Sequence, residues 1–214
     1  MNIDGIIFDN DGTLVDSEHL AAGLLQRMLA ERGVPMAADE VLARFRGVQF
    51  AHFMAHVGEL DPGFAIEPFV ESFRQRSLEL FRAGMAPMPG ALEFVQGLQV
   101  PSCVASNGPR NKIETTLHAA GLLPWFKERI VSAYEVQSWK PAPGLILAGC
   151  DLLGLAPERC LLVEDSHAGV QAGLAAGVQV VGYGLDTDFS GYLHLPGFHR
   201  AEHYRDLAAL LAAA

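Results

Sequence analysis

Short apolar runs that alternate with helical stretches constrain the fold of this chain more than any other feature. Each run has the length and the β-branched or aliphatic content of a buried strand. Four are clear and one is weaker: residues 3–8, 102–105, 160–163 and 178–183, with 129–132 the weaker one. Strands that alternate with helices predict a parallel sheet covered on both faces. We therefore expect an α/β protein.

Helical periodicity fills the segments between the later runs, and a glycine closes most of these helices. The helical stretches are residues 90–98, 109–120, 143–153 and 167–176. The uncharged stretch 166–185 reaches the length of a membrane span, but it contains His167 and several glycines. We interpret it as a helix followed by a strand, because a membrane span is a continuous apolar helix.

Residues 17 to about 83 interrupt the alternation of strands and helices. This part contains helical patterns and no strand run; the patterns cover residues 17–32, 38–44, 50–57 and 66–81. Ser17 is the expected N-cap of the first helix, because serine side chains accept bonds from free backbone N–H groups there. We expect a helical insertion after the first strand, with hinges near residues 15–17 and 83–89.

Charge and cysteine content exclude several classes of partner. The formal net charge is −10 and no run rich in lysine or arginine occurs, which argues against nucleic acid and membrane partners. The N-terminus lacks the pattern of a signal peptide. Cys103, Cys150 and Cys160 fit neither a zinc site nor a disulfide framework. We expect a cytoplasmic monomer that acts on a small molecule.

Polar residues of several kinds follow the predicted strands at their carboxyl ends. Acids follow the first strand and the strand at 160–163, a hydroxyl and an amide follow the second, and a lysine follows the weaker run. In chain order they are Asp9 and Asp11, Ser106 and Asn107, Lys140, and Glu164 and Asp165. Because ligands bind beyond the carboxyl ends of parallel strands, one pocket can hold all of these side chains.

Each motif taken alone also has an ordinary structural explanation. Asp11 before Gly12 is typical of a turn, Lys140 of an exposed loop, and Asp165 of a helix N-cap. Taken together, the residues provide carboxylates for a divalent cation, N–H and hydroxyl groups for phosphate, and a lysine that balances charge. The sequence therefore predicts a phosphate site with a metal that offsets its acids.

The set and order of these motifs resemble the haloacid dehalogenase-like hydrolase superfamily, in the branch with a small helical cap inserted after the first strand. The motifs are Asp9-x-Asp11-Gly12-Thr13, Ser106-Asn107, Lys140-Pro141 and Glu164-Asp165, and the resemblance covers essentially the whole chain. It implies a Rossmann-like parallel sheet core of residues 1–15 and 86–214. Residues 16–85 would form the helical cap domain.

The resemblance also implies a magnesium-dependent phosphatase that works through an aspartyl-phosphate. Asp9 would be the nucleophile, and Asp11 the general acid and then the general base. Mg²⁺ would be held by the Asp9 side chain, the Asp11 backbone carbonyl and Asp165, with Glu164 as a ligand or a support. The phosphoryl oxygens would be held by Ser106, Asn107 and Lys140.

The expected substrate is a sugar phosphate or a phosphosugar acid such as 6-phosphogluconate. Several segments are similar to phosphatases of that kind: residues 8–18, 44–48, 106–112 and 139–141. Arg44, Arg46 and Lys112 are candidates for binding a second anionic group on the substrate, because a guanidinium or ammonium group pairs well with a carboxylate.

Three other activities stay open at this point. A phosphomutase similar to β-phosphoglucomutase would share the core residues, but such mutases carry a histidine where a gapless match gives Ala21 and an arginine where this chain has Phe50. His19 lies nearby and leaves that comparison open. A dehalogenase would leave Asp11 and Asp165 unexplained. A non-enzymatic phospho-receiver module would lack the long helical insertion.

Overall fold

A six-stranded sheet forms the core of the computed structural model, which describes residues 2–45 and 50–212. Every pair of neighbouring strands is parallel. In sheet order the strands are β3 (Ile130–Ser132), β2 (Ser102–Ser106), β1 (Gly5–Phe8), β4 (Cys160–Glu164), β5 (Gln179–Tyr183) and β6 (Phe198–Ala201). The expected Rossmann-like α/β fold is confirmed.

Helices cover both faces of this sheet and create two hydrophobic cores. In β1, Ile6 and Phe8 belong to one core and Ile7 to the other, because successive side chains of a strand point to opposite faces. The first core also takes residues from α5 (Ala91–Gly97), α6 (Arg110–Ala119), α7 (Leu123–Phe126) and α11 (Tyr204–Ala212). The second takes them from α8 (Ala133–Val136), α9 (Gly144–Leu153) and α10 (His167–Ala176).

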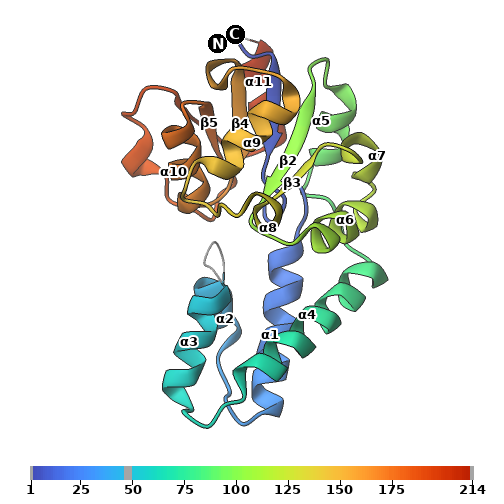
Figure 1. Cartoon of the computed structure of the whole chain (residues 1–214), viewed down its shortest axis with the longest axis vertical. Helices are drawn as coiled ribbons and strands as arrows, with labels where there is room; N and C mark the ends of the chain where they lie inside the picture. Colours follow the sequence, from blue (N-terminus) through green and yellow to red (C-terminus); the bar gives the residue numbers. More distant parts are fainter. Residues whose placement is uncertain (1, 46–49, 213–214) are drawn as a thin grey trace.

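Four helices between β1 and β2 form a separate lobe beyond the end of the sheet, as Figure 1 shows. They are α1 (Ser17–Glu31), α2 (Ala38–Phe45), α3 (Phe50–Leu60) and α4 (Ile66–Ala83). The two chain segments that enter and leave this lobe lie side by side, since Val15 pairs with Pro87 in an antiparallel bridge. The division into domains at residues 15/16 and 85/86 stays a prediction.

Several local expectations differ from the structure. Asp16, and not Ser17, is the N-cap of α1, because the helix already begins at Ser17; the Asp16 side chain makes no capping bond, and the Ser17 hydroxyl donates to Asp11. The edge strand β6 had no apolar run to indicate it, since His199 and Arg200 occupy its middle. The short helices α7 and α8 were also not expected.

Other expectations hold. The stretch 166–185 contains helix α10 and strand β5, and the three cysteines are buried and free. Among the described residues, no helix has both the length and the apolar character needed to cross a membrane.

Candidate active site

The site lies at the carboxyl edge of the sheet, where β1 is flanked by β2 and β4. Asp9 directly follows β1, Ser106 is the last residue of β2, and Glu164 is the last residue of β4. A cavity of about 810 Å³ opens at this edge, beneath helices of the inserted lobe. All seven predicted site residues line it: Asp9, Asp11, Ser106, Asn107, Lys140, Glu164 and Asp165.

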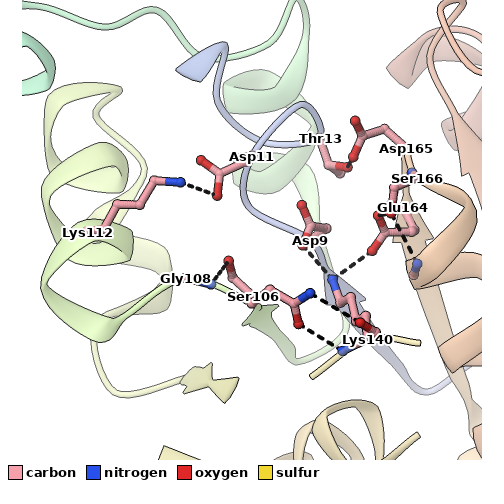
Figure 2. Close-up of polar contacts among 12 residues, drawn as sticks. Asp9, Asp11, Thr13, Ser106, Gly108, Lys112, Lys140, Glu164, Asp165 and Ser166 are labelled. Carbon is pink, nitrogen blue, oxygen red and sulfur yellow. Dashed lines mark hydrogen bonds and ion pairs between the residues drawn. The ribbon is translucent and has the colours of Figure 1, made fainter. Parts of the chain in front are cut away.

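Lys140 lies at the centre of the site and connects its acids, as Figure 2 shows. Its Nζ donates to Asp9 Oδ1 at 2.5 Å and to Glu164 Oε2 at 2.7 Å, and the residue is only 3% exposed. Burial would lower the pKa of Lys140, but the two carboxylates outweigh it and raise that pKa. The ammonium therefore stays charged, and Lys140 is not an exposed loop residue.

Asn107 positions the backbone of Lys140. Its Oδ1 accepts from the Lys140 backbone N–H at 2.9 Å, and its Nδ2 donates to the Lys140 carbonyl at 3.5 Å. These bonds join the loop after β2 to the loop that carries the lysine. Asn107 thus acts on the site through Lys140, in addition to any contact with a ligand.

Three acids form a cluster that suits a divalent cation. Carboxylate oxygens of Asp9, Glu164 and Asp165 lie within 4.8 Å of one another. Burial, reinforced by neighbouring acids, raises the pKa of Asp9 to about 7 and raises the pKa of Asp165 well above its usual value. Crowded buried carboxylates repel one another, and a hard cation with oxygen ligands relieves that repulsion. The residues present therefore fit a divalent metal.

The two acids at the end of β4 have different surroundings. Glu164 Oε1 accepts from the Ser166 N–H and hydroxyl at 3.1 and 2.7 Å, and its other oxygen bonds Lys140. Asp165 Oδ1 accepts from the Thr13 hydroxyl at 3.1 Å. Ser166, and not Asp165, is the N-cap of α10. Both oxygens of Glu164 thus have protein donors, which suits a supporting role better than direct metal ligation.

The chain turns at Gly12, directly after the two acids of the first motif. Gly12 has a φ of +78°, and a Cβ there would overlap the carboxylate of Asp165, so only glycine fits. The Asp11 carboxylate lies outside the acid cluster and accepts from the Ser17 hydroxyl and from Lys112 Nζ, the latter at 2.8 Å. Figure 2 shows Lys112 reaching Asp11 from helix α6.

This pairing controls the charge of Asp11. Burial alone would raise the pKa of Asp11, but the Lys112 ammonium and hydrogen bonds from Lys112, Ser17 and Asn10 bring it below the usual 3.8. Lys112 was a sequence candidate for contact with a second anion; in the structure it contacts a predicted catalytic acid. The sequence could not reveal this pair, because 101 positions separate the two residues.

We expect Lys112→Met to lower the free energy of unfolding by about 1 kcal/mol at neutral pH, as for partly exposed ion pairs. The lowered pKa of Asp11 means that the pair stabilises the fold above pH 3.8, the usual pKa. This contribution disappears as the pH falls through the pKa that Asp11 has in the folded protein, which lies below 3.8. Urea unfolding at several pH values measures it. The control is Lys127→Met at an exposed lysine; a loss that is independent of pH would contradict the explanation.

Ser106 offers a donor beside the acids. Its Oγ accepts from the Gly108 backbone N–H at 3.1 Å, so the hydroxyl hydrogen can point to another acceptor. The residue is buried and lines the cavity just before helix α6 begins at Arg110. A hydroxyl at this place suits a phosphoryl oxygen.

The inserted lobe contributes cavity residues that the sequence did not single out. They include Phe73, Arg74, Ser77, Leu78 and Phe81 of α4 and His52 of α3. Apolar periodicity in a helix looks the same whether that face covers a core or a cavity, so no sequence signal distinguished them.

Some of the lobe residues considered in the sequence analysis line the cavity, and others lie away from it. Arg44 is not among the described residues that line the cavity, and its Nε donates to Glu40 at 3.1 Å. Arg46 lies outside the described residues. Ala21 and Phe50 do line the cavity, whereas His19 is exposed and bonds Asp16 at 2.9 Å. The histidine and arginine expected of a mutase are therefore not supplied by His19 or by the residues at 21 and 50.

The structure has the features that the sequence motifs predicted for a haloacid dehalogenase-like hydrolase: a parallel α/β sheet, a buried aspartate beside a lysine, and a helical lobe over the carboxyl edge (Figure 1). The model of this family, described as haloacid dehalogenase-like hydrolase, matches residues 3–177. The chain belongs to this family, as the sequence motifs indicated.

Among its relatives is the 6-phosphogluconate phosphatase of Escherichia coli K12, 32% identical over 90% of this chain and 87% of that protein. The hexitol phosphatase A of the same organism is 34% identical over 88% and 86%. The closer resemblance indicated by the sequence is thus confirmed, and the chain is an enzyme of the phosphatase class.

Two solved structures are similar to this protein over nearly its whole chain. A haloacid dehalogenase family hydrolase of Deinococcus radiodurans, solved with bound phosphate and sodium, has a TM-score of 0.81 and 31% identity, and the match covers 99% of this chain and 96% of that one. A haloacid dehalogenase-like protein of Agrobacterium tumefaciens has a TM-score of 0.84 and 29% identity, covering 99% and 98%.

Proposed function

We propose that this protein is a magnesium-dependent phosphatase that hydrolyses a small phosphorylated sugar or sugar acid through an aspartyl-phosphate on Asp9. One observation carries the proposal. Asp9 is buried beside Lys140 and the acids of β4, in a cavity that also holds Asp11 and a wall of the helical lobe. A nucleophile, a proton donor and balancing charges are thus available to one bound ester.

In the first step, an Asp9 carboxylate oxygen attacks phosphorus and the bond from phosphorus to the leaving alkoxide breaks. Splitting hydrolysis into two displacements in this way makes each one easier. The Ser106 hydroxyl and the Lys140 ammonium bind the phosphoryl oxygens, and Asn107 fixes the lysine backbone. Lys140 bonds Asp9 in the free protein, so it also orients the nucleophile.

Asp11 handles the protons. Since Lys112 keeps Asp11 ionised in the free protein, the acid step requires that Asp11 take up a proton from solvent when the ester binds. As general acid it then gives this proton to the leaving alkoxide oxygen, and as general base it takes one from the water that attacks the aspartyl-phosphate. Hydrolysis of that intermediate restores the Asp9 carboxylate and releases inorganic phosphate. The bonds from Ser17 and Lys112 hold the Asp11 carboxylate apart from the acid cluster.

The residues that would hold Mg²⁺ are Asp9, Asp165 and the backbone carbonyl of Asp11, with Glu164 supporting Lys140 and the β4 loop. Bound there, the ion would neutralise charge on the carboxylates and on the phosphoryl group. The raised pKa values of Asp9 and Asp165 support this assignment.

The substrate side of the proposal rests on the helical lobe, which we propose as a cap domain of residues 16–85. Arg74 of α4 lines the cavity, is exposed, and makes no ion pair with another described residue. With Arg44 placed elsewhere, Arg74 is the better candidate for a substrate carboxylate. Cytoplasmic location and a monomeric state stay predictions.

We expect net release of phosphate from 6-phosphogluconate, with little isomerisation of β-glucose 1-phosphate. The reason is that Ala21 and Phe50 stand where a mutase would have its histidine and arginine. The assay follows free phosphate and glucose 6-phosphate in parallel for both compounds. Rapid conversion of glucose 1-phosphate with little free phosphate would establish the mutase instead. Phosphate release from other esters only would keep the reaction and discard this substrate.

A further inference from the structure

Phenylalanines of the helical lobe form an aromatic patch on the wall of the cavity. Phe50 of α3 stacks on Phe73 of α4 with ring centroids 4.9 Å apart, and Phe45 meets Phe73 edge to face at 6.1 Å. All three rings line the cavity, together with Phe81. Such rings pack well against the C–H groups of a carbon chain but offer no partner for its hydroxyls.

Ser77 interrupts the phenylalanine stripe of helix α4. Helix α4 carries Phe69, Phe73, Ser77 and Phe81 at a spacing of four, and all four are buried. A spacing of four keeps side chains on one face of a helix. Ser77 thus stands between two phenylalanines on the face that Phe73 and Phe81 present to the cavity, and it also lines the cavity. A phenylalanine there would continue the stripe; serine leaves space and a hydroxyl.

The Ser77 hydroxyl lacks a partner. The residue is 6% exposed, and its Oγ makes no hydrogen bond with any residue in the described ranges 2–45 and 50–212. A serine inside a helix often bonds the backbone carbonyl one turn earlier, and Ser77 does not. Leaving a buried hydroxyl unpaired costs stability, so such a group calls for an explanation. Ser77 lines the cavity, and rotation about its Cα–Cβ bond can turn the hydroxyl, which is covered in this structure, towards a bound ligand.

We propose that Ser77 is a specificity residue that hydrogen-bonds a hydroxyl on the organic part of the substrate. The compounds it selects are phosphate esters of polyhydroxylated chains: polyols, sugars and sugar acids. This inference rests on the proposed phosphatase function and deepens it. The aromatic patch packs against the carbon chain, and Ser77 supplies a hydrogen-bonding group within that patch. The cavity, at about 810 Å³, is large enough for such a chain beyond its phosphate.

The test compares Ser77→Ala with Ser72→Ala, a control on the same helix that does not line the cavity. Each protein is assayed with 6-phosphogluconate, with a hexitol phosphate and with p-nitrophenyl phosphate, whose leaving group has no additional hydroxyl. We expect Ser77→Ala to lower kcat/KM for the hydroxylated esters by about 3- to 10-fold, the value of one neutral hydrogen bond. The rate with p-nitrophenyl phosphate should not change.

A melting curve separates this role from a structural one. Removing an unpaired buried hydroxyl should leave the melting temperature of Ser77→Ala equal to the wild-type value or above it. Deoxy analogues then identify the hydroxyl, because its removal should cost the wild type activity and cost Ser77→Ala nothing more. Equal losses with all esters, or no loss with any hydroxylated ester, would overturn the inference. A wild type that acts on none of the esters would overturn the proposed function itself.

Discussion

An Asp9→Asn protein should fold and yet release phosphate at least about 10⁴-fold more slowly than the wild type, as when other catalytic nucleophiles are removed. The amide oxygen of asparagine does not attack phosphorus, whereas the amide keeps the size of the carboxyl group. Steady-state phosphate release measures the loss, with any ester that the wild type accepts. The control is Asp39→Asn, at an exposed acid on α2, which should keep full activity.

The melting temperature of the variant shows whether it folds, and the pKa of Asp9 predicts how it should compare with the wild type. Burial and neighbouring acids raise that pKa to about 7. A raised pKa means that the neutral carboxyl stabilises the fold below the usual 3.8 and that this contribution is lost as the pH rises through about 7. Without metal, Asp9→Asn should therefore melt no lower than the wild type at alkaline pH. Rapid hydrolysis by this folded variant would contradict the covalent mechanism.

Removal of divalent metal should have an effect of similar size. Asp9, Glu164 and Asp165 lie together, and Lys140 alone cannot offset them once a phosphate dianion enters. We expect a chelator to abolish phosphate release and added Mg²⁺ to restore it. Full activity after chelation would contradict the metal assignment and would favour a reaction that needs neither the metal nor Asp165.

Binding of the metal has a signature that does not depend on turnover. Burial raises the pKa of Asp165, so protons compete with the cation at low pH, and the rise in melting temperature caused by Mg²⁺ should grow as the pH increases. Asp165→Asn should reduce this rise, and Asp39→Asn should not. A rise that is equal in all three proteins would place the ion elsewhere.

The sequence by itself determined the class of fold and the location of the site. Apolar runs of strand length such as residues 160–163 predict strands directly, because their aliphatic and β-branched content is a local property of the sequence. Polar residues directly after those runs must lie at one edge, because the strands are parallel. For this reason Asp9, Ser106 and Glu164 could be placed in one pocket without coordinates. Strand β6 was not predicted, because His199 and Arg200 interrupt its apolar pattern.

Only the tertiary structure decided which partners these side chains have. The pair of Lys112 with Asp11 and the bonds from Asn107 to Lys140 join segments far apart in the chain, and no local pattern encodes a distance between them. Tertiary packing also decided which residues of the helical lobe face the cavity. Arg44 and Ser77 lie on similar amphipathic helices, yet packing turns only Ser77 to the cavity. Helical periodicity defines a buried face, while the packing of helices against the sheet decides what that face covers.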